Sequence, residues 1–464
     1  MNMSILIKNG KVVTPKGISI GDVFVEGETI AAIGERIDRG ADKTLDAAGK
    51  YVIPGGVDVH THLEAPVGGT ISSDDFETGT RAAAFGGTTC IVDFATQSKG
   101  HSLNDAYVSW RQKAEKATID YGLHMIVVDV NEGRIGELDS LIDEGVTSFK
   151  LFTAYPGTLM VDDATILRVM RHAGKRGALV AVHAEDSGTI DPLIRKALAE
   201  GRTAPIEHAL TRPATAEAEA VHRVIALAHN ANVPVYIVHV SSADGLAEIS
   251  RAQKEGVNVV GETCPQYLFL TQEDLARPDF EGAKFVLTPP LRTRADQNAL
   301  WNGLKAGELQ VVSTDHCPFM FQTQKRAGVN DFTKIPNGGP GIENRLQLLY
   351  HFGVNEGRFS VERWVELLSL NPAKLFGLYP KKGTLEVGSD ADIVIWDPAK
   401  EHTISASTHH MRVDYSMYEG MKVVGNADTV ISRGEIIVAH NEWLGKRGRG
   451  RYVRRSCFGG AWGG

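Results

Sequence analysis

Two histidines separated by one residue, His60 and His62, have the spacing in this chain that most directly suggests chemistry. Successive side chains of a strand point to opposite faces, so both imidazoles would point the same way if residues 57–62 are extended. Imidazole nitrogen is a good ligand for zinc and related divalent metals. A surface pair or a hydrogen-bonded pair gives the same pattern, so the motif needs support from the rest of the chain.

Four more polar residues lie in or at the ends of apolar, strand-like runs: Lys150, His183, His239 and Asp315. In a barrel enzyme the carboxyl ends of the strands converge on the active site, so these side chains would meet His60 and His62 in space. One such residue alone is more often a satisfied core polar group. Five strands that all carry one favour a shared site.

Lys150 is the most informative of the six, because a lysine inside a buried strand is costly as an ammonium ion and its pKa should fall. A neutral amine can take up carbon dioxide and become a carbamate, whose oxygens can bridge two metals. A lysine paired with a nearby carboxylate such as Asp93 is the alternative, and the sequence leaves it open.

The elements that position these residues alternate between strand-like and helix-like segments. Eight apolar runs cover residues 57–62, 89–94, 123–129, 148–152, 179–183, 235–240, 257–261 and 311–315. Helix-length stretches such as 164–175 and 216–230 separate them. This alternation predicts an α/β fold, a (β/α)8 TIM-like barrel over residues 56–379. A doubly wound open sheet is the alternative, because periodicity alone does not exclude it.

Both ends of the chain read as short strands with turns between them. Asn9-Gly10 predicts a hairpin between residues 4–8 and 11–14, and Gly27-Glu28 predicts a second one. The same pattern of short strands separated by turns returns after about residue 384. We therefore expect residues 1–55 and 380–440 to form one small β-sandwich domain.

Composition narrows the class of protein. The chain has 464 residues and a net charge of −8, which argues against a general nucleic-acid surface. Its four cysteines are scattered, no apolar stretch reaches about 18 residues, and no signal-like segment opens the chain, so we expect a cytoplasmic protein that does not span a membrane. Residues 441–464 form a basic, glycine-rich tail, which we expect to be solvated or to contact a neighbouring subunit, with a mobile end after Phe458.

The ordered set of polar residues, in a barrel flanked by a composite β domain, resembles the amidohydrolase superfamily, and more closely its dihydropyrimidinase and D-hydantoinase branch. Eight further stretches match that branch: 86–94, 148–152, 181–185, 288–292, 313–317, 335–343, 372–377 and 383–392. The resemblance runs from the first strands to the basic tail.

The resemblance implies two divalent metal ions per subunit, usually Zn²⁺, with Mn²⁺ or Co²⁺ as replacements. His60, His62 and Asp315 would hold one ion, His183 and His239 the other, and N6-carboxylated Lys150 would bridge them together with a hydroxide. That hydroxide would attack the carbonyl carbon of a hydantoin or 5,6-dihydropyrimidine ring and give an N-carbamoyl amino acid. Asp315 would act as general base and then as general acid toward the departing ring nitrogen.

Three further positions carry over from the same family. Tyr155 matches a tyrosine that stabilises the oxyanion, and Thr288 and Asn337 match residues that bind the cyclic imide. Loops 63–71, 95–101 and 152–160 should wall the pocket. An open, apolar mouth there would suit a 5-substituted hydantoin, including an aromatic one.

Three other functions remain open at this point. Allantoinases, and less readily dihydroorotases, share the metal pattern, although no basic cluster for an orotate carboxylate lies beside the metal strands. A non-catalytic scaffold such as the collapsin response mediator proteins shares the fold but lacks part of the metal set. The family is commonly tetrameric, so the resemblance also implies a homotetramer.

Overall fold

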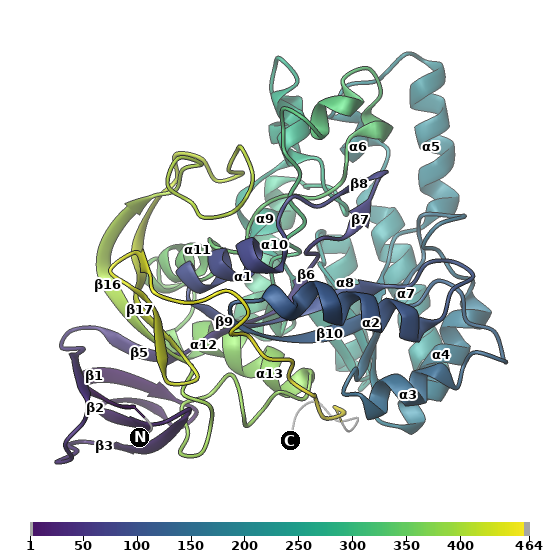
Figure 1. The fold of residues 1–464 in the computed structure, drawn as a ribbon. Helices are drawn as coiled ribbons and strands as arrows, with labels where there is room; N and C mark the ends of the chain where they lie inside the picture. The colour runs from purple at the N-terminus through teal and green to yellow at the C-terminus, as the bar shows by residue number, and fades with distance from the viewer. Residues whose placement is uncertain (1–2, 459–464) are drawn as a thin grey trace.

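The computed structural model describes residues 3–458, and the last residues of the tail lie outside this range. Its central element is a sheet of eight parallel strands in chain order (Figure 1). The strands are β6 (Gly56–Thr61), β9 (Thr88–Thr96), β10 (Asp120–Ile126), β11 (Ser148–Phe152), β12 (Leu179–His183), β13 (Val235–Ile237), β14 (Val259–Thr263) and β15 (Val311–Val312). All eight predicted runs overlap these strands, and the predicted barrel is confirmed.

The sheet closes between its first and last strands through contacts that span most of the chain. The His62 amide donates to the His316 carbonyl at 2.9 Å, and Thr61 and His316 form a parallel bridge. Arg345 donates to the carbonyls of Val57 in β6 and Val312 in β15, both at 3.0 Å. These contacts exclude the open doubly wound alternative.

Helices cover the outside of the barrel. The main ones are α1 (Phe76–Phe85), α2 (Leu103–Lys113), α3 (Glu137–Asp143), α4 (Asp163–Lys175), α5 (Ser187–Ala199), α6 (Glu207–Leu210), α7 (Ala214–Ala231), α8 (Ala243–Lys254), α9 (Pro265–Phe269), α10 (Arg294–Ala306), α11 (Arg345–Leu349), α12 (Val361–Val365) and α13 (Asn371–Leu375). In α4, Asp162 caps the first turn and the buried residues Ile166, Val169, Met170 and Ala173 follow a helical spacing. None of the helices within residues 3–458 combines the length and the apolar character needed to cross a membrane.

Strands from both chain ends form a second, mixed sheet, seen at the left of Figure 1. It contains β1 (Ser4–Thr14), β2 (Gly17–Glu26), β3 (Thr29–Gly34), β4 (Lys43–Asp46), β5 (Tyr51–Pro54), β16 (Ile393–Thr403), β17 (Lys422–Ser432), β18 (Glu435–Ala439) and β19 (Glu442–Trp443). The key junction is the antiparallel pairing of β5 with β16. Apolar side chains of both ends, such as Ile7, Val25 and Ile393, share one core, as expected for a β-sandwich built from both termini.

The predicted hairpin at Asn9-Gly10 is wrong. β1 runs through this dipeptide, and its register against β2 shifts between Ile7 and Gly10. Asn9 has a φ of 61°, and its amide donates to the Asp22 carboxylate at 3.0 Å. The conformational freedom that suits a tight turn here serves a bulge inside a long strand instead. The second predicted hairpin, at Gly27-Glu28, joins β2 to β3 as expected.

The expectation of a solvated tail is wrong for its inner part. Arg455 is 4% exposed, and its guanidinium donates to Ser148 Oγ at 2.9 Å and to the Phe376 carbonyl at 3.3 Å. The Val453 amide donates to the Tyr121 carbonyl at 2.7 Å. The tail therefore packs across the amino-terminal end of the barrel of its own chain, because the strands there offer buried oxygen acceptors for arginine.

Candidate active site

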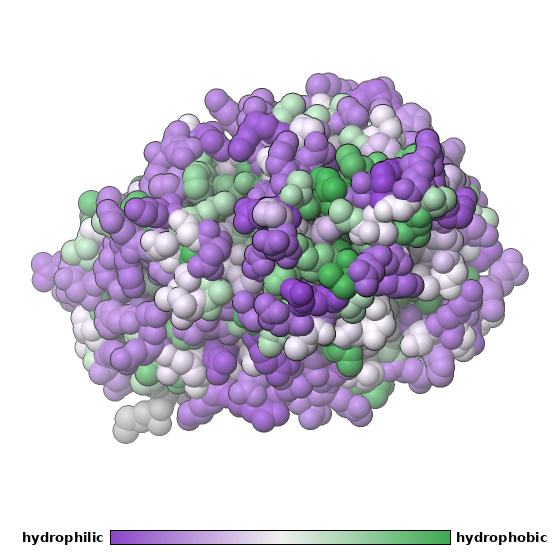
Figure 2. Space-filling model, turned by 90° about the horizontal axis from the view of Figure 1, so that it is seen from above, coloured by the Kyte–Doolittle hydropathy of each residue, from purple (hydrophilic) through white to green (hydrophobic). Residues whose placement is uncertain are grey.

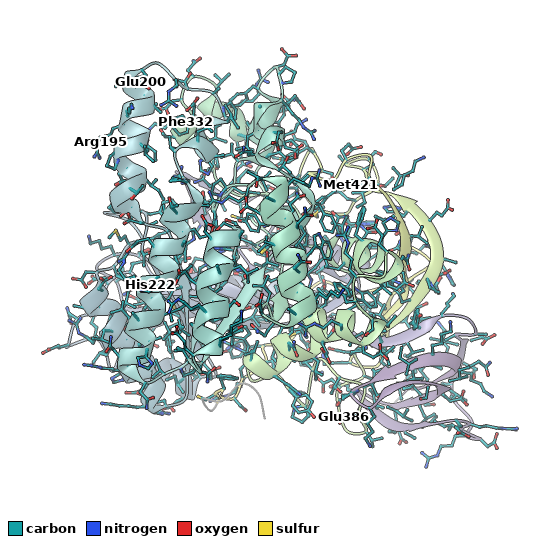
Figure 3. All side chains as sticks on the ribbon, turned by 180° about the vertical axis from the view of Figure 1, so that it is seen from behind. Arg195, Glu200, His222, Phe332, Glu386 and Met421 are labelled. Carbon is teal, nitrogen blue, oxygen red and sulfur yellow. The ribbon has the colours of Figure 1, made fainter. Side chains whose placement is uncertain are left out.

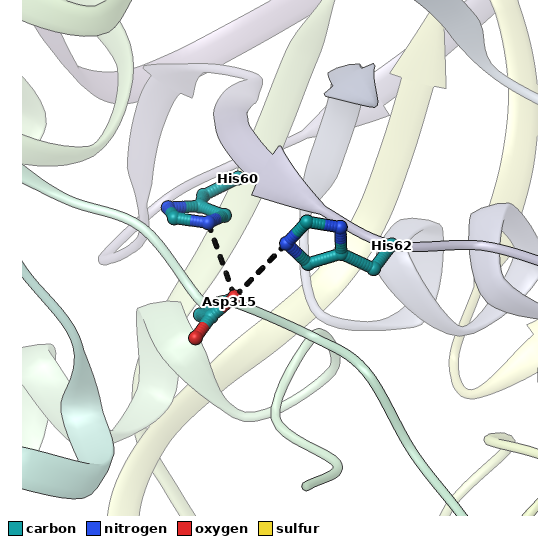
Figure 4. A group of neighbouring side chains, drawn as sticks. All are labelled: His60, His62 and Asp315. Carbon is teal, nitrogen blue, oxygen red and sulfur yellow. Dashed lines mark ion pairs between the residues drawn. The ribbon is translucent and has the colours of Figure 1, made fainter. Parts of the chain in front are cut away.

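Three of the predicted residues meet at the carboxyl ends of β6 and β15 (Figure 4). His60 Nε2 lies 3.1 Å from Asp315 Oδ1, and His62 Nε2 lies 3.2 Å from the same oxygen. One ligand atom from each residue falls within 4.8 Å of the others. Two imidazole nitrogens and one carboxylate oxygen that converge in this way form a donor set that fits a divalent cation.

The other predicted histidines form a second pair beside the first group. His183 ends β12, and its Nδ1 lies 2.9 Å from Nε2 of His239, which follows β13. The His239 ring in turn stacks on the ring of His60, with centroids 5.4 Å apart. The structure thus brings five of the six predicted ligands into one contiguous cluster.

Lys150 completes the cluster. Its Nζ lies 2.9 Å from His60 Nε2 and over the rings of Phe94 and Phe152, and Phe152 stacks on His183. Among residues 3–458, no carboxylate forms an ion pair with Lys150. The alternative partner, Asp93, faces the other side of β9, where it accepts hydrogen bonds from Thr61 Oγ1 at 2.7 Å and the Leu63 amide at 2.9 Å. Alternation along the strand explains this result, because Phe94 faces inward and its neighbour Asp93 must face outward.

Buried carboxylates fix the orientation of the histidines. Glu262 Oε1 lies 2.7 Å from His60 Nδ1 and accepts the His239 amide at 3.0 Å, while Glu262 Oε2 accepts the Tyr236 hydroxyl at 2.8 Å. Glu185 Oε2 lies 2.8 Å from His183 Nε2. A carboxylate accepts a hydrogen from the nitrogen that it faces, so Nδ1 of His60 and Nε2 of His183 are the donor nitrogens, and the other nitrogen of each ring faces the cluster, where a cation would bind.

We predict that Glu262→Gln weakens metal binding about 10- to 100-fold, because the amide no longer orients His60 as a charged acceptor does. Competition titration of the chelator-treated protein with Zn²⁺ measures this change directly. Glu248→Gln is the matched control, because Glu248 pairs with His222 on the outer helices. Equal affinities of wild type and Glu262→Gln would contradict the prediction.

The backbone holds two of these ligands in unusual conformations. Asp315 has a φ of 50° and His239 a φ of 39°, values that non-glycine residues rarely adopt. Asp58 helps to fix the neighbouring Asp315 in place, because the Asp58 carboxylate accepts hydrogen bonds from the Thr314 hydroxyl at 2.6 Å and from the Thr314 amide at 3.2 Å. The surrounding structure therefore imposes the geometry of the cluster.

Burial and neighbouring charges set the protonation of the cluster. Burial lowers the pKa of His62 to about 4, which keeps its imidazole neutral. Burial raises the pKa of Asp315, but His60 and His62 outweigh this effect and hold it well below the ordinary value. Burial also lowers the pKa of Lys150 to about 8. The neutral imidazole of His62, the ionised Asp315 carboxylate and a partly neutral Lys150 amine are forms that suit metal binding and carboxylation.

The three residues predicted to bind substrate also lie together. The Tyr155 hydroxyl interacts with the side chains of Thr288 and Asn337, and burial raises the pKa of Tyr155 to about 12. Tyr155 has a φ of 66°. Behind Thr288, His208 Nε2 lies 3.1 Å from the threonine hydroxyl. These contacts place a protonated phenol and two short polar side chains in one group.

The sequence pattern did not identify Glu185, Glu262 and His208 as residues of the site. Glu262 is a charged residue inside the buried strand β14, the same signal that identified Lys150. The predicted strand ends one residue earlier, at position 261, and therefore leaves Glu262 outside it. Glu185 follows His183 by two residues, but no strand periodicity extends to it. His208 lies in a short helix with no motif to mark it.

Comparison with known proteins places this site in a defined family. A model of the amidohydrolase family matches residues 51–437. The chain is 53% identical over 462 residues to a D-hydantoinase of Streptomyces coelicolor, covering 98% of this chain and 99% of the relative. The dihydropyrimidinase structure from Brevibacillus agri has a TM-score of 0.97 and 52% identity, covering 98% and 99% of the two chains. The L-hydantoinase structure from Arthrobacter aurescens has a TM-score of 0.89 and 32% identity, covering 98% and 100%.

A barrel with this cluster of histidines, lysine and aspartate is typical of metal-dependent hydrolases, and membership in that class implies a divalent metal centre. The chain belongs to the amidohydrolase family, and within it to the dihydropyrimidinase and D-hydantoinase branch. The resemblance inferred from the sequence motifs is thereby confirmed.

Proposed function

We propose that this enzyme opens hydantoin and 5,6-dihydropyrimidine rings by hydrolysing the cyclic amide bond, which yields N-carbamoyl amino acids. The observation that carries the proposal is the cluster of six ligand-type side chains beside Tyr155, Thr288 and Asn337, in a chain that aligns over nearly its full length with enzymes named for these substrates.

The cluster fits two divalent cations, for which Zn²⁺ is the first choice and Mn²⁺ or Co²⁺ are alternatives. His60, His62 and Asp315 would hold one, and His183 and His239 the other. Lys150, carboxylated on Nζ, would supply anionic oxygens to both, which suits its place beside His60 and over Phe152, with no ion-pair partner among residues 3–458. Bound there, the cations would lower the pKa of water and polarise the substrate carbonyl.

The protein's own side chains would carry out the remaining steps, which are proton transfer, stabilisation of the oxyanion and binding of the ring. The Asp315 carboxylate accepts the proton of the attacking water and returns it to the ring nitrogen as the C–N bond breaks. The Tyr155 hydroxyl, whose high pKa keeps it protonated, donates to the carbonyl oxygen as negative charge develops. Thr288 and Asn337 hold the imide edge of the ring.

Apolar side chains beside the cluster favour a hydrophobic ring substituent. Phe94, Ile126, Val128 and Phe152 form one apolar group against which Tyr155 and Leu159 pack. Green hydrophobic surface interrupts the hydrophilic residues on the face seen from above in Figure 2. Since identity is 53% to the D-hydantoinase and 32% to the L-hydantoinase, we propose a preference for D-5-substituted hydantoins.

Turnover measurements test the function. We expect ring opening of dihydrouracil and of 5-phenylhydantoin, with the D isomer of a resolved, slowly racemising 5-alkylhydantoin consumed first. Allantoin and dihydroorotate should react far more slowly, and a preference for either would overturn the assignment. About two metal ions per chain are expected in protein never exposed to chelator, whereas well under one would favour a non-catalytic scaffold.

We further propose a cytoplasmic homotetramer to which the basic tail contributes. All four cysteines are free thiols, which suits a reducing compartment. Removal of the residues after Gly445 should then shift sedimentation toward smaller species. Because Arg455 also packs on its own barrel, the truncated chain must first be shown to keep the native circular dichroism spectrum. An unchanged sedimentation profile in such a folded variant would contradict the proposal.

A further inference from the structure

Another buried lysine, Lys325, lies outside the metal cluster and has no role in the chemistry described above. It begins the short helix η4 (Lys325–Gly328), which packs against η3 (Glu281–Phe285) and η5 (Phe332–Lys334). Figure 3 labels Phe332 of η5, the short helix that follows η4 in the chain. Lys325 is 0% exposed, and no carboxylate within residues 3–458 forms an ion pair with it.

The partners of Lys325 are two backbone carbonyls. Its Nζ donates to the Val286 carbonyl at 2.9 Å and to the Pro336 carbonyl at 3.1 Å. Val286 lies two residues before Thr288, and Pro336 comes directly before Asn337. The Gly338 amide also donates to the Val286 carbonyl, at 3.1 Å. One amino group thus joins the two loops that carry the proposed imide-binding residues.

This arrangement is costly for the fold. Burial lowers the pKa of Lys325 to about 7, and the Cys317 thiol acts in the other direction without offsetting it. An amine that is buried without a charged partner destabilises the fold, and an apolar side chain of similar length commonly serves stability as well or better. Methionine or leucine would therefore fill a purely structural role with less destabilisation of the fold.

We infer that Lys325 is a positioning residue for substrate binding: it holds the segments of Thr288 and Asn337 at the separation that the cyclic imide requires. The inference rests on the proposed role of these two residues. A shift of about 1 Å in a substrate-positioning group costs up to about 100-fold in rate, so the spacing of the two loops matters even though Lys325 itself does not touch the ring.

Lys325→Met tests the inference, because it keeps the apolar stem of the side chain and removes the terminal amine that donates the hydrogen bonds. We expect KM for dihydrouracil to rise at least about tenfold, while kcat changes less than about threefold and the metal content stays at the wild-type value. A loss of folded protein would lower the apparent kcat and leave KM unchanged. Amide hydrogen exchange at Gly338 should also become faster.

Arg455→Met is the matched control. Arg455 is likewise a buried cation that binds carbonyl and hydroxyl oxygens without an ion pair in the described part of the chain, but it lies at the opposite end of the barrel. The KM of Arg455→Met for dihydrouracil should stay within about twofold of the wild-type value. An equal rise in KM for both variants would overturn the inference, because any buried cation would then have the same effect.

Asn337→Ala separates the inference from its premise. If this variant leaves KM unchanged, the proposed substrate role of Asn337 fails. If Asn337→Ala raises KM and Lys325→Met does not, the inference about Lys325 fails alone. Lys325→Gln serves where the methionine variant does not fold, since its amide keeps two donors on a stem shorter by one atom; an unchanged KM despite faster exchange at Gly338 would again refute the inference.

Discussion

Replacing Lys150 by methionine is expected to lower kcat/KM at least about 1,000-fold, which corresponds to about 4 kcal/mol of transition-state stabilisation. The Lys150 side chain lies beside His60 of the first group and over the ring of Phe152, which stacks on His183 of the second pair. Methionine fills the same volume between Phe94 and Phe152 but cannot be carboxylated. We therefore expect the fold to survive and the metal content to fall to one ion per chain or fewer.

Three measurements check this result. Elemental analysis gives the metal content, turnover of dihydrouracil gives kcat/KM, and carbon NMR of wild-type protein in ¹³C-bicarbonate should show a carbamate signal that the variant lacks. Lys150→Arg is the control for charge, because arginine stays cationic and does not become a carbamate. Retention of two metal ions and of a tenth of the activity in either variant would refute the proposed bridging role.

Replacing Lys382 by methionine should lower the free energy of unfolding by about 3–5 kcal/mol. Lys382 is buried, and its Nζ lies 2.6 Å from Asp120, 2.8 Å from Asp390 and 2.9 Å from Asp392. Asp120 begins the barrel strand β10, whereas Asp392 immediately precedes β16 of the terminal sheet. Removal of the cation leaves three carboxylates close together at the junction of the two sheets, with Arg433 as the remaining cation on Asp120.

Urea denaturation followed by circular dichroism measures this change. Lys381→Met is the matched control: its side chain is exposed and adjacent in sequence, so its effect should stay within about 0.5 kcal/mol. The KM of Lys382→Met should be normal in the folded fraction, because the junction lies at the end of the barrel away from the metal cluster. A loss below about 1 kcal/mol would show that the carboxylates find other partners or become protonated.

Local pattern was sufficient to predict the barrel and its metal-ligand set. Strand periodicity fixes which side chains share a face, and parallel strands in a barrel all present their carboxyl ends to one place. His60, Lys150 and Asp315 could therefore be brought together without coordinates. The predicted strand around Lys150 matches β11 residue for residue. Family motifs then extended the set to Tyr155, Thr288 and Asn337, which periodicity does not identify.

Local pattern was insufficient where a residue has two conformational uses or its partner is distant. Asn9-Gly10 suits a turn and a bulge equally well, and the long-range pairing of β1 with β2, β4 and β5 selects the bulge. The basic tail carries no local sign of its acceptors, because the oxygens that bind Arg455 belong to Leu123, Ser148 and Phe376.

The sequence by itself determined the architecture, the family and the six side chains at the strand ends, because these follow from periodicity and from local motifs. Tertiary structure alone decided which groups orient them. Glu262 reaches His60 across 202 residues, Asp58 reaches Thr314 across 256, and Lys325 joins two separate loops. Periodicity predicts the face on which a side chain lies, but its hydrogen-bond partner is set by the closure of the barrel, which brings distant segments within hydrogen-bond distance of one another.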